Sequence, residues 1–205
     1  MPMHDWTRVG DEEYHDFCIA WIAELRKLMN CGRLPTGHYA LSEVQGGEAG
    51  SEQNTLVVRR GPEHRVVALI ELVSPGMKRN SRRLSLFVQK ILNVISSNIN
   101  VLIVDPFPPG RSDLNGIHGA VWTSLENDEF RLPVDKPLTL ASYSVGQTLE
   151  AYIEPFSVGQ AMIDMPLFVE AHFYLPIPLE TAYLSAWDGT ADHVRDQLTS
   201  SPNDA

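Results

Sequence analysis

The chain has no apolar stretch long enough to cross a membrane as a helix, because its longest apolar runs stop well short of about 18 residues. Residues 1–10 lack the basic start and the apolar middle of a secretory signal peptide. Cysteine is also scarce. Cys18 and Cys31 have no CxxC spacing, so they provide neither a zinc site nor a disulfide framework. We therefore expect a soluble, cytoplasmic protein that has no membrane partner.

Basic residues are also fewer than acidic residues. The sequence has 16 lysine and arginine residues against 26 aspartate and glutamate residues, which gives a net charge of −10. Broad, sequence-independent binding to nucleic acid requires many cationic contacts to phosphate, so this composition argues against it. A polyanionic partner would need a local basic patch. One such cluster is present, formed by Lys78, Arg79, Arg82 and Arg83.

The sequence has no Walker loop, no GxSxG motif and no Rossmann glycine pattern, so these nucleotide-binding and hydrolase signatures are excluded. What is present is an ordinary globular composition, with 43% apolar and 20% charged residues in a chain of 205. This length is enough for one domain with a real core. We predict a single domain at 1–198, with its core at about 12–106 and a C-terminal extension at about 107–198, followed by a flexible tail at 199–205.

The spacing of apolar residues predicts the elements of the first half. A helix is expected to begin near Asp11 and to end by Gly32. Three strands are expected after it, at 37–44, 55–60 and 65–73, and the last two are joined by a hairpin.

From Asn80 the pattern changes to a helix whose apolar stripe ends at Ile95, and an apolar strand follows at 100–105. A strand, a helix and a second apolar strand in this order predict a crossover unit with parallel strands inside the sheet. Two more strands are predicted at 137–145 and 148–156, and a helix is predicted near the C-terminus. The expected fold class is α/β, with a mixed sheet flanked by helices and a β-containing C-terminal extension.

Glu71 interrupts an apolar strand face. Side chains alternate along a strand, so Glu71 shares its face with Val67, Leu69 and Val73. A carboxylate buried without partners costs several kcal/mol, so Glu71 must be paired, protonated, bound to a cation or close to water. Ligands collect beyond the carboxyl ends of parallel strands, and Glu71 lies near such an end.

The basic cluster follows Glu71 directly. A helix N-terminus beside Lys78 and the nearby arginines is suited to phosphate, and a carboxylate at the same rim could hold a divalent cation. This combination indicates metal-assisted attack on a phosphodiester. The alternative is structural, with Glu71 in a strand-end salt bridge to Lys78 or Arg83. Asp105 ends the next strand, where it either caps the following turn, which we favour, or lines the same rim.

Several motifs, in order, resemble a bacterial family defined only as a domain of unknown function. They are "IELVSPGMK", "VLIVDPFPPG", "GIHGAVW" and "DKPLTLASY", together with the opening "MHDWTRV". The likeness covers the chain from Met1 to about Trp187 and implies no particular activity.

Residues 66–105 also resemble the core of the PD-(D/E)XK, or restriction-endonuclease-like, superfamily, in the version where a glutamate precedes "SP" and the next strand ends in "VDP". In that superfamily acidic residues and a lysine hold Mg²⁺ and the phosphate. The resemblance implies that Glu71 is the acidic residue of the third strand and that Glu43 is the earlier one. The lysine expected two residues after Glu71 is replaced by Val73, which leaves Lys78 as its substitute.

The superfamily also places an aspartate on the second strand, where this sequence has Gln53 and Asn54 beside Glu52. An amide can bind a metal but supplies no negative charge, so affinity for Mg²⁺ should fall unless Glu52 or Glu48 replaces the aspartate. A relative that has lost catalysis would be a binding or regulatory module.

The leading hypothesis is a nuclease-like fold with Mg²⁺- or Mn²⁺-dependent phosphodiesterase activity on nucleic acid. Its expected catalytic residues are Glu71 and Lys78. Its expected metal ligands are Glu43, Glu71 and Glu52, and its expected phosphate-binding residues are Arg79, Arg82 and Arg83. The alternative is a catalytically inactive module that binds an anionic partner, such as another phosphate-bearing ligand, through the 78–83 cluster.

Overall fold

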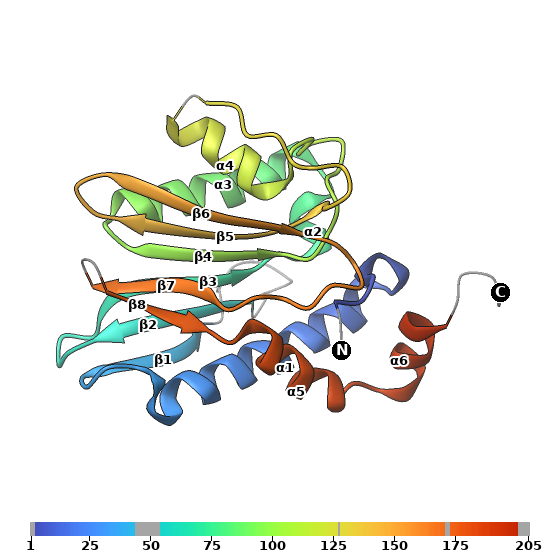
Figure 1. Cartoon of the computed structure of the whole chain (residues 1–205), viewed down its shortest axis with the longest axis horizontal. Coiled ribbons are helices and arrows are strands. Elements are labelled where there is room, and N and C mark those ends of the chain that lie inside the picture. The colour runs from blue at the N-terminus through green and yellow to red at the C-terminus, as the bar shows by residue number, and fades with distance from the viewer. Residues whose placement is uncertain (1–2, 44–53, 127, 171–172, 201–205) are drawn as a thin grey trace.

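A computed structural model describes residues 3–43, 54–126, 128–170 and 173–200. The expected fold class is confirmed, because the chain forms an α/β structure with a six-stranded mixed sheet whose strands lie side by side in the order in which they follow along the chain (Figure 1). A separate two-stranded antiparallel sheet from the C-terminal part of the chain packs against this main sheet.

The first three strands form an antiparallel meander of β1 (His38–Glu43), β2 (Thr55–Arg60) and β3 (Arg65–Leu72). The β2–β3 turn is tight, and Gly61 and His64 both adopt positive φ there. Glycine adopts this conformation without strain, which explains its position at the turn.

The predicted crossover unit is present. Helix α2 (Pro75–Lys78) and helix α3 (Ser81–Ser96) connect β3 to β4 (Asn100–Asp105), and β3 and β4 are parallel. The Asn80 side chain caps α3 by accepting a hydrogen bond from the Arg83 amide. The apolar stripe of α3 packs on the sheet. It is formed by Leu84, Phe87, Val88, Ile91 and Ile95.

The C-terminal half does more than pack on the core, because β5 (Leu138–Val145) and β6 (Leu149–Phe156) extend the main sheet beyond β4. Helix α4 (Gly116–Glu126) lies next to α3, and these two helices cover one face of the sheet (Figure 1). The sequence pattern did not predict α4, since its glycines resemble those of a loop.

The opposite face is covered by α1 (Asp11–Leu28), α5 (Leu179–Asp188) and the small sheet of β7 (Met165–Glu170) and β8 (Phe173–Ile177) (Figure 1). Helices α1 and α5 pack on each other, and β7 contacts β3, β4 and β5. The larger hydrophobic core lies on this side and contains Trp6, Trp21 and Trp187.

The remaining elements are short. The 3₁₀ turn η1 (Trp6–Arg8) precedes α1, and the turn η2 (Met29–Arg33) follows it, with Gly32 at positive φ. Helix α6 (Asp192–Thr199) includes Thr199, which was assigned to the tail, whereas 201–205 fall outside the described residues. Within the described ranges, no helix has the length and apolarity needed to span a membrane.

Candidate functional site

Two of the predicted acidic residues lie in one row across the sheet. In the antiparallel register Glu43 of β1 is opposite Thr55 of β2, and Thr55 is opposite Glu71 of β3. Directly opposed residues project from the same face. This is the face that α3 covers over β3, so the three side chains form a polar strip beside that helix.

Glu71 is fully buried and is neutralised within the chain. Its Oε1 lies 2.6 Å from the Nζ of Lys90, a residue of α3. The Thr55 hydroxyl lies 3.0 and 3.1 Å from the two carboxylate oxygens and donates to them. Burial raises the pKa of Glu71 above its usual value of 4.5, the Lys90 charge and these hydrogen bonds oppose the rise, and the Glu43 charge adds to it.

Glu43 is the open end of the row. Its side chain is 41% exposed, and its Oε1 is 2.5 Å from a guanidinium nitrogen of Arg59. Arg59 also donates to the carbonyl oxygen of His64 at 2.9 Å. An ion pair this exposed contributes little to stability, so Arg59 can leave Glu43 at small cost. Glu52, the third predicted metal ligand, lies outside the described residues together with Glu48 and Gln53.

Lys78 lies in a different cluster. Its Nζ is 2.9 Å from Asp105 Oδ2 and 2.9 Å from Asp113 Oδ2, and it donates to the carbonyl oxygen of Phe107 at 2.8 Å. The Lys78 side chain is only 7% exposed. The expectation that Lys78 substitutes for the lysine beside Glu71 is therefore not met, because three buried oxygen atoms already hold its ammonium group.

The arginines of the basic cluster separate into two groups. Arg79 is paired with Asp11 of α1 at 2.5 Å, whereas Arg82 and Arg83 are exposed on the first turn of α3. Arg83 and Lys90 are seven residues apart, close to two full turns, so they lie on the same side of the helix. A phosphate that approached Lys90 along α3 would thus meet Arg83 as well.

The polar strip offers oxygen ligands that suit Mg²⁺ or Mn²⁺, namely two carboxylates and one hydroxyl. In the described part of the chain no group of three or more histidine, cysteine, aspartate or glutamate side chains is placed to hold a metal. Both carboxylates already have internal cations, so a metal must displace Arg59 or Lys90. The donor chemistry fits a divalent ion, and the competition should weaken its binding.

Lys90, the cationic partner of Glu71, was not predicted from the sequence. One signal was available, since Lys90 directly precedes Ile91 at the edge of the α3 stripe. Side chains in a helix lean toward its N-terminus, so this cation can reach back to the end of β3. Asp105 was predicted correctly as a cap, because its Oδ1 accepts a hydrogen bond from the Phe107 amide at 3.3 Å.

Comparison of the chain with protein-family models, with curated proteins and with solved structures gave no match.

Proposed function

We propose that this chain is a divalent-metal-dependent phosphodiesterase that acts on nucleic acid, with a nuclease-like core whose acidic pair is Glu43 and Glu71. The observation that carries the proposal is the row across the sheet that places the carboxylates of Glu43 and Glu71 on one face, with the ammonium group of Lys90 against Glu71. The restriction-endonuclease resemblance expects an early acidic residue, an acidic residue on the third strand and a lysine near it. In this proposal Lys90, and not Lys78, is the lysine that the resemblance expects.

The residues of the chain have separate tasks in this proposal. Glu43 and Glu71 would hold the metal, which when bound would polarise the phosphate and activate water. Thr55 keeps the Glu71 carboxylate in position through its hydroxyl. Lys90 moves from Glu71 to the phosphate and stabilises the negative charge that develops there, and Arg83 binds the next phosphate along α3.

The first experiment is a thermal unfolding titration with Mg²⁺ and Mn²⁺, combined with hydrolysis assays on single- and double-stranded DNA and on RNA. A metal at a hundredfold excess over its Kd stabilises the fold by about 2.7 kcal/mol, or roughly 5–10 °C for this size. We expect Glu71→Gln to abolish both the shift and hydrolysis, and Glu43→Gln to reduce both. Glu63→Gln, on the exposed β2–β3 turn, is the matched control. Absence of any metal shift and of any hydrolysis in the native chain would refute the proposal.

A second function is favoured by one observation. Lys90 and Thr55 satisfy Glu71 without a metal, so the strip can be purely structural, as expected for a binding module. Its anion-binding surface would then be Arg82 and Arg83, since Lys78 and Arg79 are held by acidic partners. Metal-independent binding of nucleic acid that Arg82→Ala and Arg83→Ala both weaken, with no hydrolysis, would establish this second function.

A further inference from the structure

A groove lies on the other side of the sheet, where the small sheet ends. Strand β7 contacts mainly β3, β4 and β5, so the face of β6 that points away from α4 is only partly covered, and it is exposed at Glu150 and Tyr152 but buried at Phe156. Alternation along β6 places Leu149, Ala151 and Ile153 against the α4 side, and this leaves Glu150 and Tyr152 exposed. The resulting cavity has a volume of about 540 Å³. Sites for small organic ligands are typically of this size.

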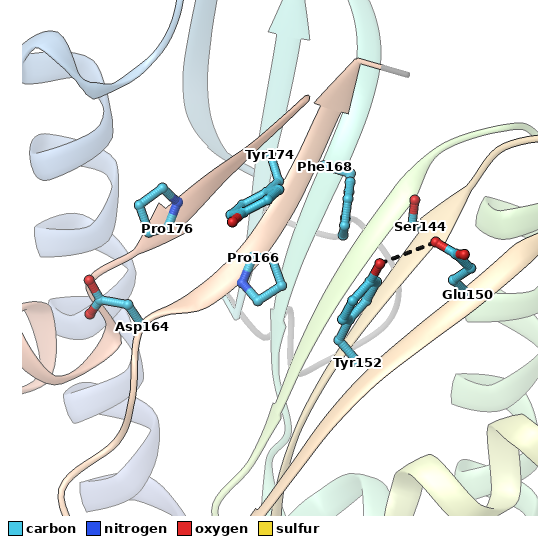
Figure 2. Close-up of a pocket in the computed structure, with 8 residues that line it drawn as sticks. All are labelled: Ser144, Glu150, Tyr152, Asp164, Pro166, Phe168, Tyr174 and Pro176. Carbon is cyan, nitrogen blue, oxygen red and sulfur yellow. Dashed lines mark hydrogen bonds between the residues drawn. The ribbon is translucent and has the colours of Figure 1, made fainter. Parts of the chain in front are cut away.

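Three aromatic rings line the groove in a row (Figure 2). Tyr152 of β6 lies 5.3 Å from Phe168 of β7, and Phe168 lies 5.5 Å from Tyr174 of β8, measured between ring centroids. Phe168 is nearly buried and forms the floor, whereas Tyr152 and Tyr174 are 43% and 54% exposed. Exposed tyrosines from two different sheets are therefore held with their rings toward one cavity.

The charge of the groove is entirely negative. Its lining contains Glu150 and Asp164 and no lysine, arginine or histidine among the described residues. The Tyr152 hydroxyl donates to Glu150 Oε2 at 3.2 Å, which fixes the ring and the carboxylate relative to each other (Figure 2). This hydrogen bond is the main reason that the pKa of Tyr152 lies above its usual value of 10.0. Neither carboxylate has an ion pair to a described basic side chain within the groove.

The two walls are also fixed to each other. The hydroxyl of Ser142, a fully buried residue of β5, donates to the carbonyl oxygen of Pro166 on β7 at 2.5 Å. Pro166 and Pro176 are paired across β7 and β8 and add rigid apolar surface beside Tyr174. A groove with fixed walls costs a ligand little reorganisation on binding.

We propose that this groove is a binding site for an organic cation, specifically a quaternary or substituted ammonium group held against Tyr152, Phe168 and Tyr174. The face of an aromatic ring attracts a cation, and cages of several rings are how proteins recognise such groups. Glu150 and Asp164 add long-range attraction, which the net charge of −10 reinforces. Two acidic side chains disfavour an anionic ligand such as a nucleotide.

A second groove has a different lining. It has a volume of about 630 Å³, and its lining includes Arg60, Arg65 and Glu170 but no aromatic ring. The two grooves are similar in size, so size alone does not identify a ligand site. Only the first combines aromatic faces with unneutralised carboxylates.

The test is a binding titration of the 205-residue chain, monitored by NMR or calorimetry. Tetramethylammonium and choline are the charged probes, and 3,3-dimethylbutanol is the neutral probe with the shape of choline. We expect choline to bind about tenfold more tightly than the neutral alcohol, as the strength of cation–π contacts suggests. Tyr174→Ala should weaken binding about tenfold, and Glu150→Gln a few-fold with reduced salt dependence.

Matched control variants distinguish a loss of binding at the groove from a loss of folded structure. Phe173→Ala removes the neighbouring exposed ring of β8, which does not line the groove, and Glu154→Gln removes a charge from the same strand as Glu150. Neither should change binding. Glu71→Gln should also leave it unchanged, because Glu71 lies on the opposite face of the sheet.

The source of the ammonium group is resolved by comparing choline with a peptide that contains trimethyllysine. Binding of choline alone identifies a free small cation, and much tighter binding of the peptide identifies a modified side chain. Both outcomes support the proposal. Equal binding of the neutral alcohol, tighter binding of an uncharged proline-rich peptide, or no effect of Tyr174→Ala would each overturn it.

Discussion

Two clusters that each contain a lysine and a carboxylate occupy the same sheet face, one at the end of β3 and the other at the end of β4. The Glu71 cluster has one carboxylate and one ammonium group, and Lys90 is 25% exposed. The Asp105 cluster has two carboxylates around one ammonium group, and all three side chains are almost fully buried. The charges of the first cluster cancel and its lysine is in contact with water. The second cluster has one more negative than positive charge and is closed to water.

The partners of Asp105 explain the difference. Asp105 accepts hydrogen bonds from the amides of Phe107 and Ile117, and Asp113 accepts one from the amide of Gly110. These contacts hold the segment between β4 and α4 in place, so this cluster is structural. Among the described residues Glu71 is held by side chains alone, those of Thr55 and Lys90, and Lys90 is partly exposed. An acidic residue near the carboxyl end of a strand is thus a site candidate only where its counter-ion can leave.

The largest expected effect is the loss of the Lys78 charge. Lys78→Met leaves Asp105 and Asp113 buried without a counter-ion, which should cost about 3–5 kcal/mol of the free energy of unfolding. For a chain of this size that corresponds to a decrease of Tm by roughly 6–20 °C. Urea and thermal unfolding measure the change.

The control for this variant is Lys27→Met, which removes an exposed lysine of α1 and should change stability by less than about 0.5 kcal/mol. Adding Asp113→Asn to Lys78→Met removes one of the two carboxylates left without a counter-ion, and it should recover part of the lost stability. A stability of Lys78→Met equal to that of the native chain would contradict the structural role of this cluster.

A smaller effect is expected at the other cluster. Lys90→Met leaves Glu71 buried with the Thr55 hydroxyl as its remaining described partner, but water can enter from the partly exposed side where the lysine was. We expect a loss of about 1–3 kcal/mol, which is less than for Lys78→Met. Combining Lys90→Met with Glu71→Gln should restore most of the loss, because no charge then remains. If Lys90→Met is the more damaging variant, the comparison between the clusters is reversed.

The sequence predicted the parts of the fold that depend on local periodicity. The apolar run of β4 and the helical stripe of α3 were both found, and their order was enough to predict parallel pairing of β3 with β4. Strands β5 and β6 were found by the same pattern. Helix α4 was missed because Gly116 and Gly119 are poor helix formers, and its helical state depends on packing against α3 and the sheet.

The candidate site was predicted in part, for a similar reason. Alternation along β3 identified Glu71 as a buried carboxylate without reference to any other element. Its partner depends on how α3 packs on the sheet, and nearness in sequence favoured Lys78 over Lys90. The groove at Tyr152 and Tyr174 could not be predicted, because its two walls come from separate sheets.

The smallest expected effect concerns pH. Burial raises the pKa of Glu71, so the folded chain retains this proton to a higher pH than the unfolded chain does. Between the ordinary value of 4.5 and the folded pKa, the folded state binds more protons, and the stability contributed by Glu71 falls as pH rises, by at most about 1.4 kcal/mol per pH unit. The stability difference between the native chain and Glu71→Gln should decrease over this window.

NMR titration of the carboxyl carbon of Glu71 should give a midpoint above 4.5. Thr55→Val should move it higher, because it removes a hydrogen bond to the charged form, and a native midpoint below 4.5 would mean that the Lys90 charge outweighs burial.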